Sequence, residues 1–224
     1  MSSTLHIGPK NYSSWSLRPW LALRWGGIAF DEHLIWLGQP GYGQGEIADV
    51  KAVSPAGTVP ALHVDGLVIW DSLAIAEWAA EQTPSLWPAD GALRAQARSA
   101  TAEMHSGFAG IRRDMPMNIQ RRCTVAEWPD DTQRNLRRLF ELWTGCREAH
   151  HALGPWLFGT RSIADAFYTP VATRLRTYGV EMNALCQAYV DTLLGDEHFI
   201  AWEQDSETGV WDKPGFPVID GLYW

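Results

Sequence analysis

Short apolar segments and helical patterns alternate in the first third of the chain. The hydrophobic pattern predicts a strand over residues 4–8, a helix over residues 16–26 and a second strand over residues 28–37. Gly26-Gly27 ends the helical pattern, as glycine commonly does. The order strand, helix, strand favours a parallel pair of strands.

A hairpin pattern and a further helical pattern follow. Residues 61–64 and 67–70 predict two short strands, and Asp65-Gly66 between them is a strong hairpin signal. An amphipathic helix is predicted directly after Asp71-Ser72, residues that are typical of a helix start. Pro60 precedes a strand, where a cis peptide bond would expose a neighbouring backbone group to a ligand. Residues 1–82 therefore have the element order of a thioredoxin-like domain.

The pattern becomes helical after a break at residues 83–90, which predict a linker between two domains. The predicted helices cover residues 91–121 with a bend near Pro116, 131–153, a segment opened at Ser162 and Asp165 by a capping box, 181–194 and 196–203. The tail from Asp205 is rich in turns but carries Trp211 and Trp224, so we expect it to pack against the body.

Composition narrows the possible functions. The 224 residues are 46% hydrophobic and carry a formal net charge of −8, which argues against a nucleic-acid or anionic-membrane partner. Cys123, Cys146 and Cys186 lie far apart, which predicts neither a disulfide framework nor a metal site. The first residues lack the pattern of a signal peptide, and no apolar run reaches the roughly 20 residues of a membrane span. We therefore expect a cytoplasmic protein.

Hydroxyl groups gather where the first strand meets the first helix, in the stretch of residues 9–20. A helix start offers unpaired N–H groups and a partial positive charge, which suit an anion or a thiolate. Ser13, Ser14 and Ser16 either serve such a site or only cap the helix, and this stretch alone leaves both open. Residues 38–45 are rich in glycine but fit no nucleotide-binding motif, so they form either a surface loop or a lid beside a pocket.

Four segments, in this order along the chain, resemble motifs of the cytosolic glutathione S-transferases. Residues 13–18 resemble the S-S-C-S-x-R motif of the zeta class, and residues 58–62 resemble the V-P-x-L segment with its cis-proline. Residues 71–75 resemble the (E/Q/D)-S-x-A-I segment that holds the γ-glutamyl group, and residues 159–165 resemble the capping box of the family. The nearest resemblance is to bacterial members that begin with N-Y-S-S-W-S. Trp15 stands where the zeta motif has its cysteine.

The resemblance implies a fold and a function. It implies an α/β thioredoxin-like glutathione-binding domain over residues 1–82, a linker over 83–90, and an all-helical domain over 91–224 with a Trp-rich tail. It implies a transferase that activates the glutathione thiol as a thiolate for attack on a small electrophile, as in detoxification. Glutathione would be the co-substrate, no metal would be needed, and the protein would be a homodimer.

The resemblance also implies roles for individual residues. Ser13 would donate a hydrogen bond to the sulfur, with Ser14 as the second candidate, Tyr12 as a weaker one and Ser16 as the helix cap. The other residues expected to bind glutathione are Ser14, Trp15, Thr58, Val59, Pro60, Asp71 and Ser72. The expected electrophile pocket consists of Tyr12, Met104, His105, Phe108, Arg112 and Met115. Lys10, Gln44 and Lys51 are candidates for binding the glycyl carboxylate.

Other functions remain open at this point. A glutathione-dependent isomerase or peroxidase of the same fold would use the same thiolate. A non-catalytic protein of this fold would need no thiolate donor, so the serine motif disfavours it. A disulfide reductase is disfavoured because residues 12–16 contain no cysteine.

Overall fold

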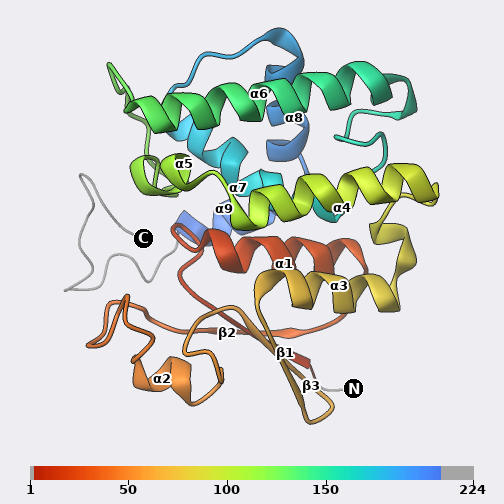
Figure 1. The fold of residues 1–224 in the computed structure, drawn as a ribbon. Helices are drawn as coiled ribbons and strands as arrows, with labels where there is room; N and C mark the ends of the chain where they lie inside the picture. The colour runs from red at the N-terminus through yellow and green to blue at the C-terminus, as the bar shows by residue number, and fades with distance from the viewer. Residues whose placement is uncertain (1–2, 208–224) are drawn as a thin grey trace.

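The computed structural model describes residues 3–207, and Figure 1 shows their arrangement. The expected packing of the tail, which rests on Trp211 and Trp224, lies outside these residues. Within residues 3–207, every helix falls short of the length and apolar character that crossing a membrane requires.

A four-stranded sheet forms the first part of the chain, with the order β2-β1-β3-β4. Its strands are β1 (Ser3–Ile7), β2 (Asp31–Leu34), β3 (Ala61–Val64) and β4 (Leu67–Trp70). β1 pairs with β2 in parallel, whereas β3 is antiparallel to both β1 and β4. The predicted hairpin is confirmed, with left-handed φ values of 48° at Asp65 and 82° at Gly66.

Two helices cover one face of this sheet. α1 (Ser14–Trp25) and α3 (Ser72–Gln82) pack side by side on it, and the short α2 (Ala48–Lys51) lies on the other side of the sheet (Figure 1). α1 buries most of its length because it packs against α3, α7 (Ile163–Thr177) and α9 (Glu197–Glu207). The first part is therefore a thioredoxin-like α/β unit, as predicted.

Between residue 84 and residue 207, the named elements are all helices. They are η1 (Pro84–Leu86), α4 (Gly91–Ser106), α5 (Ala109–Asp114), α6 (Asp130–His150), η2 (His151–Leu153), α7 (Ile163–Thr177), α8 (Ala184–Leu194) and α9 (Glu197–Glu207). α7 is buried along nearly its whole length, because it packs against α1, α4 and α8. The predicted combination of a thioredoxin-like part and an all-helical part is confirmed.

The prediction of one helix over residues 91–121 is wrong. The structure has two helices there, α4 and α5, separated by Gly107 and Phe108. Phe108 adopts a left-handed conformation with φ 57°, which a continuing α-helix does not allow. The second strand is also shorter than predicted, since only Asp31–Leu34 pair with β1.

The predicted capping box at the start of α7 is confirmed. The buried Asp165 accepts hydrogen bonds at Oδ2 from the N–H (2.8 Å) and the hydroxyl (3.0 Å) of Ser162. At Oδ1 it accepts bonds from the N–H of Leu157 (3.0 Å) and the hydroxyl of Tyr189 (2.8 Å). One carboxylate thus ties the preceding loop and α8 to the start of the central helix.

Candidate active site

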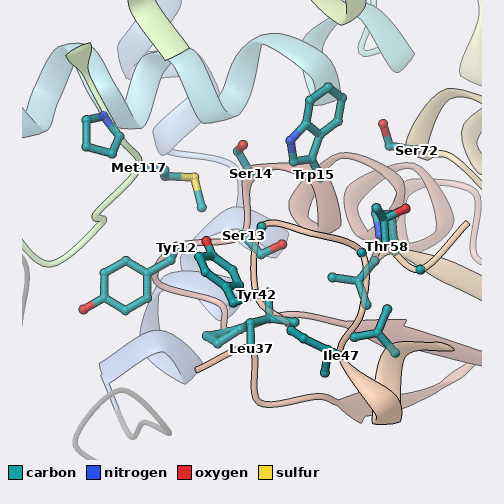
Figure 2. Close-up of a pocket in the computed structure, with 18 of the residues that line it drawn as sticks. Tyr12, Ser13, Ser14, Trp15, Leu37, Tyr42, Ile47, Thr58, Ser72 and Met117 are labelled. Carbon is teal, nitrogen blue, oxygen red and sulfur yellow. The ribbon is translucent and has the colours of Figure 1, made fainter. Parts of the chain in front are cut away.

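A cavity of about 580 Å³ opens beside the start of α1 (Figure 2). Its walls come from the start of α1, the glycine-rich loop after β2, the loop before β3, the start of α3, and parts of the helical region. Ten of the residues singled out from the sequence line it: Tyr12, Ser13, Ser14, Trp15, Thr58, Val59, Pro60, Asp71, Ser72 and Arg112. Most of the lining is apolar, as in typical small-molecule sites.

Ser13 is the N-cap of α1 and also faces the cavity. Its Oγ accepts a hydrogen bond from the N–H of Ser16 at 3.3 Å and donates one to Ser16 Oγ at 2.7 Å. Ser16 Oγ in turn accepts the N–H of Gly8 at 3.1 Å. The expectation that Ser16 caps the helix is therefore wrong, because the helix begins at Ser14, two residues before the predicted start.

Ser14 is the first residue of α1 and bonds to the helical region. Its Oγ accepts a hydrogen bond from Nη2 of Arg174, on α7, at 3.1 Å. The two serine hydroxyls point in different directions, with Ser14 turned toward α7 (Figure 2). Arg174 is buried, and this burial, with the charge of Arg112, lowers its pKa to about 9. Because Arg174 is the donor, the hydroxyl proton of Ser14 remains available for another acceptor.

The start of α1 favours negative charge. The first turn of α1 contains no acidic residue that would offset the positive end of the helix. Ser13, Ser14 and Trp15 from this turn all line the cavity. An anion bound here therefore meets hydroxyl donors and a favourable helix end together.

A second polar region lies across the cavity at the start of α3. Asp71 caps α3, since its Oδ1 accepts the N–H of Leu73 at 2.7 Å. Its Oδ2 lies 3.4 Å from Nε2 of His105, and this contact, followed by the backbone bonds, holds the pKa of Asp71 below its usual value despite burial. The buried hydroxyl of Ser72 has no hydrogen-bond partner among residues 3–207. A carboxylate and an unsatisfied hydroxyl therefore stand together at a helix start.

The loop before β3 completes this side of the cavity. Thr58, Val59 and Pro60 line it, and the Val59–Pro60 peptide bond is cis. Gly57 has φ 66°, and a Cβ atom there would lie 2.3 Å from the carbonyl oxygen of Gly45. The glycine-rich loop therefore packs directly against this segment.

The structure separates the six residues expected to form the electrophile pocket. Tyr12 and Arg112 line the cavity, although the Tyr12 hydroxyl points away from Ser13 (Figure 2). Met104, Phe108 and Met115 belong to the hydrophobic core instead, because the apolar face of this region packs inside the helical part. His105 lies behind the cavity, in contact with Asp71 and edge-on to Trp15 at 5.5 Å.

Several lining residues were not expected from the sequence. They are Leu37, Tyr42, Ile47, Val50, Pro116, Met117 and Arg174, together with Pro9 and glycines of the loops. The glycine-rich stretch lies beside the pocket, in agreement with one of the two interpretations left open for it. The three candidates for the glycyl carboxylate do not line the cavity: Lys10 pairs with Glu32 and Asp205, Lys51 pairs with Glu46, and Gln44 is exposed.

Comparisons with known proteins agree with this geometry. Residues 12–82 match the family model described as the glutathione S-transferase N-terminal domain. A search of curated proteins finds no match. One similar solved structure is a glutathione transferase homolog from Burkholderia gl BGR1 with bound glutathione, at 20% identity and a TM-score of 0.71, covering 93% of this chain and 100% of that chain.

Two further solved structures are similar over most of the chain. A glutathione transferase from Methylococcus capsulatus str. Bath is 24% identical, with a TM-score of 0.65, and the match covers 92% of this chain and 99% of that chain. A theta class glutathione S-transferase from Xanthomonas axonopodis pv. citri with glutathione bound is 25% identical, with a TM-score of 0.62 and coverage of 89% and 96%. Residues 12–82 thus match the N-terminal domain of the glutathione S-transferases, and the chain as a whole shares the fold of these solved structures.

Proposed function

We propose that the protein is a glutathione S-transferase that binds glutathione in the described cavity and activates its thiol as a thiolate for attack on a small electrophile. The observation that carries this proposal is the pair of serines at the positive end of α1, both of which line the cavity. The glutathione bound in the Burkholderia and Xanthomonas structures supports the same ligand. Isomerisation and peroxide reduction start from the same thiolate, so they remain alternatives within this proposal.

The energy that thiol activation requires is modest. A free thiol has a pKa near ~8.5, and lowering it to about 6.5 takes roughly 2.7 kcal/mol. A charge-assisted hydrogen bond supplies about 1.5–3 kcal/mol, and a helix end supplies about 0.3–2 kcal/mol. One serine hydroxyl and the start of α1 together are therefore sufficient.

Ser13 is our first candidate for the donor. Its proton now goes to Ser16 Oγ, at 2.7 Å, but the direction of this bond can reverse. If the Ser16 hydroxyl donates to Ser13 Oγ, the Ser13 proton becomes available for the sulfur, and Ser16 Oγ still accepts the N–H of Gly8. Ser14 is the second candidate, because the bond from Arg174 leaves its own proton to donate.

The remaining groups suggest how glutathione lies in the cavity. The backbone of Val59 would pair with the cysteinyl unit like an added strand. Asp71 would pair with the γ-glutamyl ammonium, and the unsatisfied Ser72 hydroxyl at the start of α3 would bind its carboxylate. Thr58, Pro60 and Trp15 would form the surrounding walls in this arrangement.

The organisation of the chain is part of the same proposal. We assign residues 1–82 to a glutathione-binding domain, 83–90 to a linker and 91–224 to a helical domain. The cytoplasmic location, the homodimeric state and the absence of nucleic-acid and membrane partners stay predictions. Sedimentation of the purified protein measures the oligomeric state.

The test compares Ser13→Ala with Ser14→Ala. We expect Ser13→Ala to bind glutathione nearly as the parent does, to raise the pKa of the bound thiol and to slow turnover by roughly tenfold to a hundredfold, the loss of one charge-assisted hydrogen bond. Ultraviolet difference spectroscopy follows the thiolate, and calorimetry follows binding. If turnover is unchanged in Ser13→Ala but strongly reduced in Ser14→Ala, Ser14 is the hydrogen-bond donor to the sulfur. If turnover is unchanged in both variants, the proposal that these serines activate the thiol is wrong.

A further inference from the structure

Three arginines from distant parts of the chain meet at one end of the cavity. The guanidinium carbon of Arg18, on α1, lies 4.2 Å from the centroid of the Trp15 ring, and that of Arg112, on α5, lies 4.8 Å from it. Arg174, on α7, reaches the same region through its bond to Ser14. The three cations therefore surround the first turn of α1, beside the proposed position of the sulfur.

Arg18 is the least expected of the three. Its side chain is fully buried, and among residues 3–207 none of its three guanidinium nitrogens has a hydrogen-bond partner. It packs against the rings of Trp15 and Phe167, the latter at 5.1 Å. A buried cation without hydrogen bonds or a salt bridge disfavours folding. The packing of the fold therefore gives no reason for a charge at this position.

The charges around this end of the cavity do not balance. Asp71 supplies the negative charge that acts on Arg18, while Arg112 and Arg174 add to the positive charge. The Asp71 carboxylate also contacts His105 and accepts a hydrogen bond from the N–H of Leu73 at the start of α3. The thiolate of glutathione would cancel one of these positive charges, and at this end of the cavity at least one would remain to pair with a further anionic group.

Arg112 can bring this charge into direct contact with a ligand. Its Nε donates to the carbonyl of Gly107 at 3.0 Å, and its Nη2 donates to the carbonyls of Met104 and His105. These bonds fix the guanidinium at the cavity wall. Within the described part of the chain, Nη1 of Arg112 has no hydrogen-bond partner, so it is available to an anionic ligand.

We propose that the electrophile of this enzyme carries a carboxylate, which pairs with Arg112 while its carbon body packs against the exposed Trp15. Arg18 lies behind Trp15 and strengthens the positive potential there without touching the ligand. The inference rests on the proposed function. With an aryl chloride as the electrophile, the thiolate forms a bond to the chlorinated carbon, and chloride leaves with the electron pair of the broken bond.

The test uses two probes, 4-chloro-3,5-dinitrobenzoate and its methyl ester. For each, kcat/KM is divided by the rate of the uncatalysed reaction with glutathione, which corrects for their different reactivity. We expect this quotient to be about tenfold higher for the benzoate than for the ester, the lower end of what one hydrogen bond to a charged group contributes. Arg112→Met and Arg18→Met each lower this preference to near unity, whereas Arg18→Lys, which keeps the charge, retains most of it.

The control is Arg138→Met. Arg138 lies on α6, pairs with Glu103 and does not line the cavity, so its loss leaves the preference unchanged. An ester preference in the parent protein, or a benzoate preference that survives both Arg112→Met and Arg18→Met, refutes the proposal while the transferase function stands. Turnover of neither probe, together with an unshifted thiol pKa, refutes both. If Arg18→Met does not fold, Arg112→Met and Arg18→Lys still decide the outcome.

Discussion

Replacing Arg18 with methionine is expected to make the protein more stable. Arg18 carries a buried charge, and its nitrogens have no hydrogen-bond partners among residues 3–207. After relaxation, such a burial still costs several kcal/mol, which contacts with the rings of Trp15 and Phe167 offset by about 1–2 kcal/mol each. Methionine has a similar length and fits the same apolar surroundings. We expect Arg18→Met to raise the free energy of unfolding by about 1–3 kcal/mol.

Urea unfolding without glutathione measures this change. A higher midpoint with an unchanged slope is the expected result, with a rise in melting temperature of roughly 2–4 °C per kcal/mol for a protein of this size. Arg138→Met is the control, since loss of its partly exposed pair with Glu103 costs only about 0–1 kcal/mol. If Arg18→Met instead loses more than about 1 kcal/mol, Arg18 supports the fold, and the reasoning that assigns its charge to function is wrong.

Three other variants test separate parts of the structure. Asp165→Ala leaves four buried donors without an acceptor, so we expect the free energy of unfolding in urea to fall by about 3–5 kcal/mol. A fall of less than about 1 kcal/mol would contradict the stabilising role of the capping box. Burial, then the charges of His63 and His33, lower the pKa of His6 to about 4, below the ~6.5 of the unfolded chain. Between these two pKa values the unfolded state binds more protons than the folded state, so the free energy of unfolding falls by about 1–2 kcal/mol as the pH drops from ~6.5 to ~4. If the unfolding free energy of His6→Asn depends on pH with the same slope as that of the parent protein, His6 is not the cause. Gly57→Ala drives a Cβ into the backbone of the glycine-rich loop, and we expect about tenfold weaker glutathione binding by calorimetry, whereas unchanged affinity shows that this loop is not part of the site.

Local signals predicted much of the fold. The Asp65-Gly66 hairpin and the Ser162–Asp165 capping box were readable because a few adjacent residues determine their geometry. Helix boundaries were less accurate. Three nearby serine hydroxyls are equivalent cap candidates in the sequence, so the sequence does not show which of them caps α1. The cap is Ser13 rather than Ser16.

Long-range packing could not be predicted in the same way. Arg174 bonds to Ser14 across 160 positions of the sequence, and no local pattern marks it. Met104 and Phe108 lie on an apolar face, but periodicity does not show whether such a face meets a cavity or the core. The buried guanidinium of Arg18 lacks hydrogen-bond partners because of how distant segments pack around it, and no local sequence pattern predicts that packing.

The pKa of the glutathione thiol bound to the protein tests the central claim most directly. We expect ultraviolet difference titration of the complex to give a value of about 6.5, compared with ~8.5 for the free thiol, and a return toward the free value in Ser13→Ala. A bound thiol that titrates like free glutathione would show that the serines at the start of α1 do not activate it.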